Sequence, residues 1–113
     1  MISERKGKQF DESQYEILIR CSVKGDLTEW NEWREKNQKA SILLEGANFI
    51  SANLAGADLW KANLAGANLR NVNLAGADLW KANLKSTDLW KANLKGAKLI
   101  AAIVDRQTFI SGL

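Results

Sequence analysis

A five-residue period runs through the C-terminal half of the chain. A large apolar residue stands at every fifth position. Two positions before it stands Ala, replaced only by Val72 and Thr87, and the position between them holds Asn or Asp until Lys98. Such a period is neither 3.6 nor 2, so these segments are not amphipathic helices or ordinary strands. It is an internal repeat that predicts stacked structural units with one continuous core. The large residues are Phe49, Leu54, Leu59, Leu64, Leu69, Leu74, Leu79, Leu84, Leu89, Leu94 and Leu99.

Each unit offers one large and one small apolar residue for burial. We expect Leu and Ala to point inward, and Asn or Asp and the last two residues to point outward. One large and one small residue on each side fill a narrow column without voids. Each buried Leu contributes about 1.5–3 kcal/mol of transfer free energy.

The motif Ala-(Asp/Asn)-Leu-x-x resembles that of the pentapeptide-repeat family, and it fills about half the chain. The resemblance implies a β-solenoid, namely a right-handed quadrilateral β-helix with four pentapeptides per coil. Leu-Trp-Lys-Ala-Asn-Leu segments begin at Leu59, Leu79 and Leu89, so they are separated by four repeat units and then by two. This spacing independently favours an even number of sides.

Folding the repeat at four units per coil separates the turn positions into columns. One column holds Gly56, Gly76 and Gly96, whereas another holds Lys61 and Lys81. Gly suits a turn with positive φ and Lys does not. We therefore expect two turn types. The alternative is that Gly is present only because it is small.

Residues 1–46 differ from the repeat and predict a helical cap. We expect a disordered tail over 1–10, a two-helix cap over 11–41 and the repeat region over 42–113. Asp11 and Gln14 have capping-box spacing, and Phe10 with Tyr15 has the spacing of a hydrophobic staple. Gly25 is expected to end the first helix in a left-handed conformation. The apolar stripe of that helix comprises Tyr15, Leu18, Ile19 and Val23.

A second helix is predicted to end near Asn37. Asp26 and Glu29 repeat the capping-box spacing before it. The segment Trp30-Asn31-Glu32-Trp33-Arg34 resembles a Trp-Asn-x-Trp-Arg helix that precedes pentapeptide repeats in some bacterial, especially cyanobacterial, members. We expect Trp30, Trp33 or both to cover the N-terminal end of the Leu column, because an uncovered coil exposes backbone edges and Leu side chains.

Composition leaves little room for catalysis. The 113 residues include no His, and no Ser/His, Cys/His or metal-ligand constellation occurs. We predict no enzyme activity, no catalytic residue, no metal and no cofactor. Cys21 is the single Cys and cannot form an internal disulfide. We expect it to be a small buried apolar residue rather than a nucleophile. With no apolar leader or spanning segment, the expected location is the cytoplasm, away from membranes.

Three Trp residues are expected on the outside of the repeat region, each followed by Lys. Exposed Trp marks contact sites, yet Trp and Lys also pack along flat β-faces, the Lys stem lying over the ring. Both interpretations stay open. Trp60 and Trp80 are one coil apart and are expected to stack, and Trp90 is expected above Arg70 on the opposite side. The candidate partner-binding residues are Trp60, Trp80, Trp90, Lys61, Lys81, Lys91 and Arg70.

The charge of the repeat region bears on the partner. From Ala47 onward, eight Lys and Arg residues face four Asp residues, a net +4. Some family members resemble DNA in size and negative charge and bind type II topoisomerases, which needs acidic faces. The leading prediction is a non-enzymatic scaffold that binds an unidentified protein. The alternative is a regulator associated with DNA or a type II topoisomerase, by family analogy.

The repeat frays toward the C-terminus. Ile103 replaces the polar position, Val104 replaces Leu, and Phe109 is expected to restore a large inward residue. An open coil end offers unpaired strand edges and apolar side chains, which an end-to-end homodimer would satisfy. The competing interpretation is a small plug in which 110–113 folds over Phe109. The candidate dimer residues are Ile103, Phe109, Ile110 and Leu113.

Overall fold

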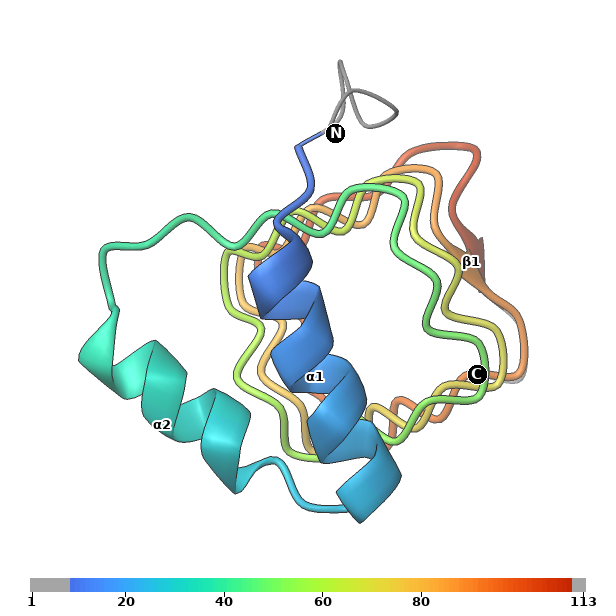
Figure 1. Cartoon of the computed structure of the whole chain (residues 1–113). Coiled ribbons are helices and arrows are strands. Elements are labelled where there is room, and N and C mark those ends of the chain that lie inside the picture. The colour runs from blue at the N-terminus through green and yellow to red at the C-terminus, as the bar shows by residue number, and fades with distance from the viewer. Residues whose placement is uncertain (1–8, 111–113) are drawn as a thin grey trace.

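Two helices and a stack of coils make up the molecule (Figure 1). The computed structural model describes residues 9–110, and of Ile110 only the backbone. Helix α1 spans Glu12–Lys24 and helix α2 spans Thr28–Lys36. The described part contains two strands, β1 (Asp88–Leu89) and β2 (Phe109–Ile110), and its other backbone pairings are isolated bridges. Leu113 and residues 1–8 lie outside that part.

Helix α1 has the ends that the sequence predicts. The Asp11 side chain accepts a hydrogen bond from the Gln14 N–H, and Gly25 ends the helix at φ 71°. The rings of Phe10 and Tyr15 lie 5.4 Å apart, as expected for a staple. Phe10 also forms an antiparallel bridge with Leu44. Gln9 and Phe10, which the sequence predicts to lie in the tail, therefore already contact the repeat region.

The buried face of α1 differs from the predicted stripe. Leu18 is buried as expected, but Val23 is 83% exposed, so its assignment to the stripe is wrong. The buried face includes Gln14 and Cys21 instead. Gln14 is buried because its amide is used twice: Nε2 donates to the Ser41 carbonyl and Oε1 accepts from the Leu43 N–H. A polar side chain thus fastens the helix to the start of the first coil.

Helix α2 ends at Lys36 as predicted but begins differently. The residue before its first turn is Leu27, which provides no side-chain cap. Asp26 accepts from the N–H and the hydroxyl of Thr28, and Glu29 pairs with Arg20 on α1 at 2.6 Å. The predicted Asp26–Glu29 capping box is therefore wrong, because both carboxylates have other partners.

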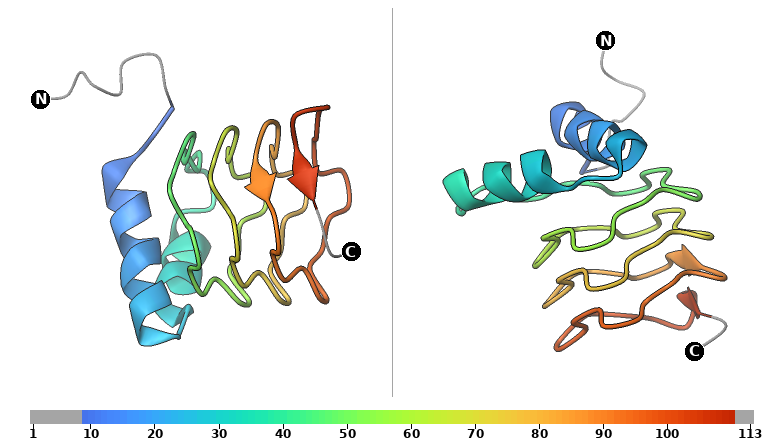
Figure 2. Two further views of the ribbon diagram at one scale, coloured as in Figure 1. Left: turned by 90° about the vertical axis from the view of Figure 1, so that its right-hand side faces the viewer. Right: turned by 90° about the horizontal axis from the view of Figure 1, so that it is seen from below.

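The repeat region stacks in register, with one coil for every four repeat units. Parallel bridges join Asn53 to Asn73 and Asn73 to Asn93, and the same offset recurs from Leu43 to Ile103. Backbone hydrogen bonds follow it: Leu54 donates to the Asn73 carbonyl at 2.8 Å, and Asn73 donates to the Ala52 carbonyl at 2.9 Å. The coils form successive layers, with α1 across their N-terminal end (Figure 2).

The inward positions form the core. The repeat Leu residues from Leu54 to Leu89 are at most 2% exposed, and most of the Ala residues two positions earlier are buried beside them. The predicted assignment of these Leu and Ala positions to the interior is confirmed, as is the burial of Leu69 and Leu74. Most Asn and Asp at the middle position accept a hydrogen bond from the N–H two residues later, as Asn73 does from Ala75.

At every fifth position the chain turns with positive φ, whatever the residue type. The Gly turns from Gly46 to Gly96 lie at φ 69–74°, and Lys61, Lys81 and Lys91 lie at 57–60°. The prediction of two turn types is wrong, because the stacked backbone imposes the left-handed conformation on Lys as well. At Gly56, Gly66 and Gly76 an added Cβ would meet no atom within 4 Å, so small size does not explain Gly there.

The register slips by a single position near the C-terminus. Asn83 pairs with Ile103, which keeps the offset of four repeat units, but Asp88 pairs with Phe109, one position beyond that offset. The extra residue lies in the turn around Asp105, whose carboxylate accepts from the Gln107 and Thr108 N–H groups. Phe109 therefore occupies the polar position rather than the predicted inward one, and it is exposed. The backbone of Ile110 takes the position aligned with Leu89.

Candidate functional site

The helices supply side chains where the first coil lacks a preceding coil. Trp30 is fully buried, and its Nε1 donates to the Asp58 carbonyl at 2.9 Å. The Ser22 hydroxyl accepts from the Asn53 N–H at 2.8 Å. Asn31 accepts from the Asp58 N–H and donates to the Gly56 carbonyl. The predicted covering role of Trp30 is confirmed, and Trp33 packs on it with ring centroids 5.4 Å apart.

Arg34 joins α2 to the wall of the first coil. Its guanidinium carbon lies 3.6 Å from the centre of the Trp60 ring, and Nη2 donates to the Trp60 carbonyl at 3.1 Å. The residue is 2% exposed, and Nε and Nη1 are buried without a hydrogen-bond partner. Burial lowers the pKa of Arg34 to about 10, and the charges of Asp58 and Asp78 offset this only in part.

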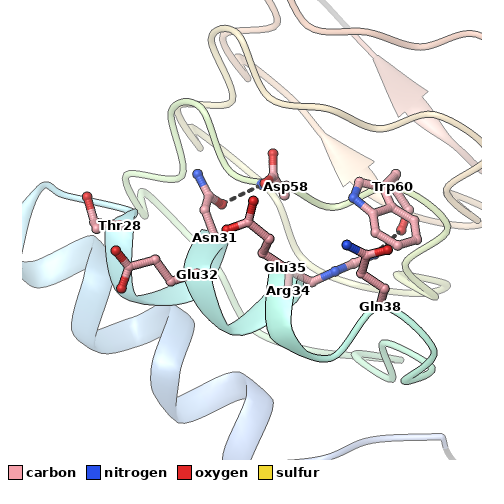
Figure 3. A pocket seen from close by; sticks show the side chains of 8 residues that line it. All are labelled: Thr28, Asn31, Glu32, Arg34, Glu35, Gln38, Asp58 and Trp60. Carbon is pink, nitrogen blue, oxygen red and sulfur yellow. Dashed lines mark hydrogen bonds between the residues drawn. The ribbon is translucent and has the colours of Figure 1, made fainter.

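A cavity of about 390 Å³ opens beside Arg34, between α2 and the first coil (Figure 3). Asp58 lies on the wall of this cavity. Asp78 and Asp88 accept a hydrogen bond from the N–H two residues later, but among the described residues the Trp60 N–H donates none to the Asp58 carboxylate. Burial raises the pKa of Asp58, and the charge of Asp78 adds to this. The lining residues are Thr28, Asn31, Glu32, Arg34, Glu35, Gln38, Asp58 and Trp60.

The predicted outward Trp residues divide into two environments. Trp60 is half-buried under Arg34, so α2 covers a residue that the sequence placed among free contact residues. Trp80 is 38% exposed, with the ammonium groups of Lys81 and Lys61 at 4.6 and 5.6 Å from its ring centre. The described ring contacts include no Trp60–Trp80 stack, so that expectation is wrong, and Lys61 lies over the Trp80 ring instead.

Trp90 has the surroundings that the sequence predicts. Arg70 lies 4.4 Å and Lys91 lies 4.5 Å from its ring centre. Arg70 also pairs with Asp88 at 3.0 Å, and Trp90 and Arg70 are both half-buried. Hydrogen bonding from the Trp90 N–H and from Arg70 outweighs the effect of burial and lowers the pKa of Asp88. The structure thus brings Trp90, Arg70 and Lys91 together.

The C-terminal coil, defined here as residues 91–110, exposes apolar side chains. Leu99 occupies an inward repeat position and is 40% exposed, and Val104 at the next inward position is 54% exposed. Ile100, Ile103 and Phe109 are also exposed. At the N-terminal end, which α1 crosses, the corresponding side chains are by contrast buried. Of the predicted dimer residues, Ile103 and Phe109 are therefore exposed, and both lie at the outward polar position of the repeat.

Other kinds of site have little support in the part of the chain that the structure describes. Residues 9–110 hold no group of three or more His, Cys, Asp or Glu that could bind a metal ion. Cys21 is free and buried, and burial raises the pKa of its thiol, which opposes nucleophilic use. No helix of the described chain is long and apolar enough to cross a bilayer.

Sequence reasoning missed two residues of this region. Asn31 and Arg34 carry the polar contacts between α2 and the first coil. Both belong to the Trp-Asn-x-Trp-Arg segment, so the signal was present in the motif. Their side-chain partners are backbone groups of residues 56–60, which carry no sequence signature of pairing.

Two solved structures are similar to part of this chain. No curated protein matches the chain. A crystal structure of a pentapeptide repeat protein, Rfr23 from the cyanobacterium Cyanothece 51142, is 40% identical over 64% of this chain and 52% of that chain, with a TM-score of 0.49. Another, alr5209 from Nostoc Pcc 7120, is 42% identical over 59% of this chain and 64% of that chain, with a TM-score of 0.34. This chain therefore spans between half and two thirds of their lengths.

The family comparison covers more than half of the sequence. Pentapeptide repeats match in eight copies over residues 43–80, 62–99 and 81–104. These ranges together contain the inward Leu and Ala positions and the turns with positive φ described above. The chain belongs to the pentapeptide-repeat family.

Proposed function

We propose that the protein is a non-enzymatic scaffold that binds another protein through its C-terminal coil. In this proposal the stacked coils form a right-handed quadrilateral β-helix that holds the surface rigid. The pairing register of four repeat units and the left-handed turn in each unit support four sides per coil. The absence of a His and of a metal-ligand cluster from the described residues is consistent with binding rather than catalysis.

The contrast between inward residues along the stack carries the proposal. Leu89 is 1% exposed, but Leu99 and Val104, which continue the same inward series, are 40% and 54% exposed. Ile103 and Phe109, at the outward polar position of the same coil, are exposed as well. An exposed apolar patch of this kind marks an interaction site, and a partner that adds a strand to the coil edge also satisfies backbone groups.

A second copy of the chain is the partner that we test first. An identical patch on two copies can pair about a two-fold axis, and such closed symmetry is the commonest form of oligomer. Sedimentation velocity over a hundredfold concentration range should show a dimer. Ile103→Ser and Phe109→Ser should weaken it at least tenfold, whereas Ile50→Ser, which changes an exposed Ile elsewhere, should not.

A strictly monomeric mass would exclude the dimer and leave a different protein as the partner. In that case the same Ser variants serve as bait controls in capture from cell extract, with identification of each captured protein. A partner that binds Ile103→Ser and Phe109→Ser as well as it binds the wild type and Ile50→Ser would contradict the C-terminal coil as the contact surface.

The alternative proposal, association with DNA or a type II topoisomerase, rests on family analogy, and the surface charge opposes the DNA mimicry by which some family members bind type II topoisomerases. Arg70, Lys81 and Lys91 lie near Trp80 or Trp90 on the coil faces, and the repeat region carries net positive charge. Nucleic-acid binding should fall steeply between about 50 and 200 mM salt. Binding through the apolar coil should not, so the salt dependence of any measured affinity separates the two proposals.

A further inference from the structure

We propose that a cavity at the N-terminal end of the stack binds a small oxyanion, a phosphate or a carboxylate. The cavity measures about 500 Å³ and lies between the segment 38–43 and residues 60–63. Arg34, Lys39 and Lys61 line it, and the described lining includes no Asp or Glu. The site goes beyond the scaffold role, and it lies at the opposite end of the stack from the C-terminal coil (Figure 2).

Arg34 is the observation that points to a ligand. It is almost completely buried, and two of its three guanidinium nitrogens have no hydrogen-bond partner. Its one hydrogen bond goes to a neutral carbonyl, that of Trp60. No carboxylate of the described chain lies within 4.0 Å of the Arg34 guanidinium. The ion pairs of the described chain are Arg20–Glu29 and Arg70–Asp88. Asp58 and Asp78 act on Arg34 only from a distance, and a buried cation with no carboxylate in contact attracts a further anion.

The second Arg–Trp pair of the molecule shows what is missing at the first. Arg70 lies over Trp90 much as Arg34 lies over Trp60, with the guanidinium carbon 4.4 Å from the ring centre. Arg70, however, is half-buried and holds the Asp88 carboxylate at 3.0 Å. In the buried pair no carboxylate of the described chain takes the place that Asp88 holds beside Arg70. Arg70 therefore gives a matched control.

The two cavities beside Arg34 have opposite charge. The one in Figure 3 is lined by Glu32, Glu35 and Asp58, which repel anions. The cavity on the side of Lys39 and Lys61 offers two exposed ammonium groups at its edge. An oxyanion therefore enters on the basic side, contacts Lys39 and Lys61 first, and is held there by the field of the buried guanidinium. Arg34 Nε and Nη1 are sealed from solvent, so direct hydrogen bonds to them require a side-chain shift.

The test titrates the full chain with inorganic phosphate at constant ionic strength. Two-dimensional ¹H–¹⁵N NMR should show saturable shifts at the amides of Lys39 and Lys61 and at the Arg34 side chain. Lys39→Gln and Lys61→Gln should each weaken binding at least threefold. Arg70→Gln and Lys85→Gln remove a positive charge outside the cavity lining and should leave the affinity unchanged. A parallel titration with N-acetylglutamate distinguishes a carboxylate ligand from a phosphate ligand.

Three results would overturn the proposal. The first is the absence of saturable shifts with either probe up to about 50 mM, well above the millimolar affinity of a weak specific site. The second is equal weakening by the cavity and control variants, which would indicate non-specific attraction. The third is binding that Lys39→Gln and Lys61→Gln leave unchanged. Because both Lys residues are exposed, these variants test the cavity without replacing the buried Arg34, whose loss could prevent folding.

Discussion

The Asn31 side chain pairs with the backbone of Asp58 as a neighbouring coil would. Its Oδ1 accepts from the Asp58 N–H at 2.8 Å (Figure 3), and its Nδ2 donates to the Gly56 carbonyl at 3.0 Å. Elsewhere in the stack such N–H groups donate to a carbonyl of the preceding coil, as Asp78 does to Ala57. One helical amide thus provides a donor and an acceptor that a coil edge would otherwise leave unpaired.

Replacing Asn31 should therefore destabilise the protein. Asn31→Ala leaves the Asp58 N–H and the Gly56 carbonyl without these partners, which should lower the free energy of unfolding by about 1–3 kcal/mol. The measurement is urea unfolding followed by Trp fluorescence. Asn37→Ala is the control, because it removes an exposed hydrogen bond to the Trp33 carbonyl within the helical segment. Equal effects of the two variants would contradict the edge-pairing role of Asn31.

The Leu column predicts a gradient of stability effects along the stack. Leu74 is fully buried, so Leu74→Ala should cost about 2–5 kcal/mol. Leu99→Ala makes the same chemical change at a position that is 40% exposed and should cost less than half as much. Both values come from urea unfolding of the monomer at low concentration. A Leu74→Ala protein as stable as the wild type would contradict the inward assignment.

The left-handed turns predict opposite outcomes for Gly and Lys. Gly76 has φ 69°, and an added Cβ meets no atom, so Gly76→Ala should cost about 1 kcal/mol through backbone strain alone. Lys81 has φ 57°, so Lys81→Gly removes strain and should be neutral or stabilising by less than about 1 kcal/mol. Thermal unfolding of both variants tests this. A clearly destabilised Lys81→Gly would mean that its side-chain contact with Trp80 outweighs the strain.

The cap of α1 predicts a pH dependence. Burial raises the pKa of Asp11, but hydrogen bonds from Ser13 and from the backbone of Gln14 and Ser13 outweigh it and lower the pKa below 3.8. The stabilisation by the charge is therefore complete above pH 3.8 and lost as the pH falls through the lower folded-state value. Asp11→Ala should cost about 1 kcal/mol at pH 7 and less at pH 2.5, because protonated Asp11 loses its charge but keeps an oxygen that accepts the hydrogen bond from the Gln14 N–H.

Asp11→Asn separates the charge from the hydrogen bond. Its amide oxygen still caps the helix, so most of the stability at pH 7 should remain while the dependence on pH near 3 disappears. Urea unfolding at pH 7 and pH 2.5 measures both effects. An Asp11→Ala protein whose loss of stability is the same at both pH values would show that the ionised form of Asp11 has no special role.

The sequence by itself determined the local features of the molecule. The period of five identifies the inward Leu and Ala, because burial of one side requires an apolar residue at each repeat. The Asp11 cap, the Phe10–Tyr15 staple and the Gly25 end of α1 follow from short-range rules and are confirmed. The pairing of Trp90 with Arg70 follows from counting four repeat units per coil.

Tertiary structure decided everything that depends on neighbours from distant segments. Stacked backbone hydrogen bonds impose positive φ on Lys61 and Lys81, against their own preference. One inserted residue before Phe109 moves that ring from the interior to the surface, because successive strand residues face opposite sides. Packing of α2 against the first coil buries Arg34 over Trp60, and no local pattern specifies this contact between distant parts of the chain. These contacts depend on where the coils and helices meet, which a repeat motif does not encode.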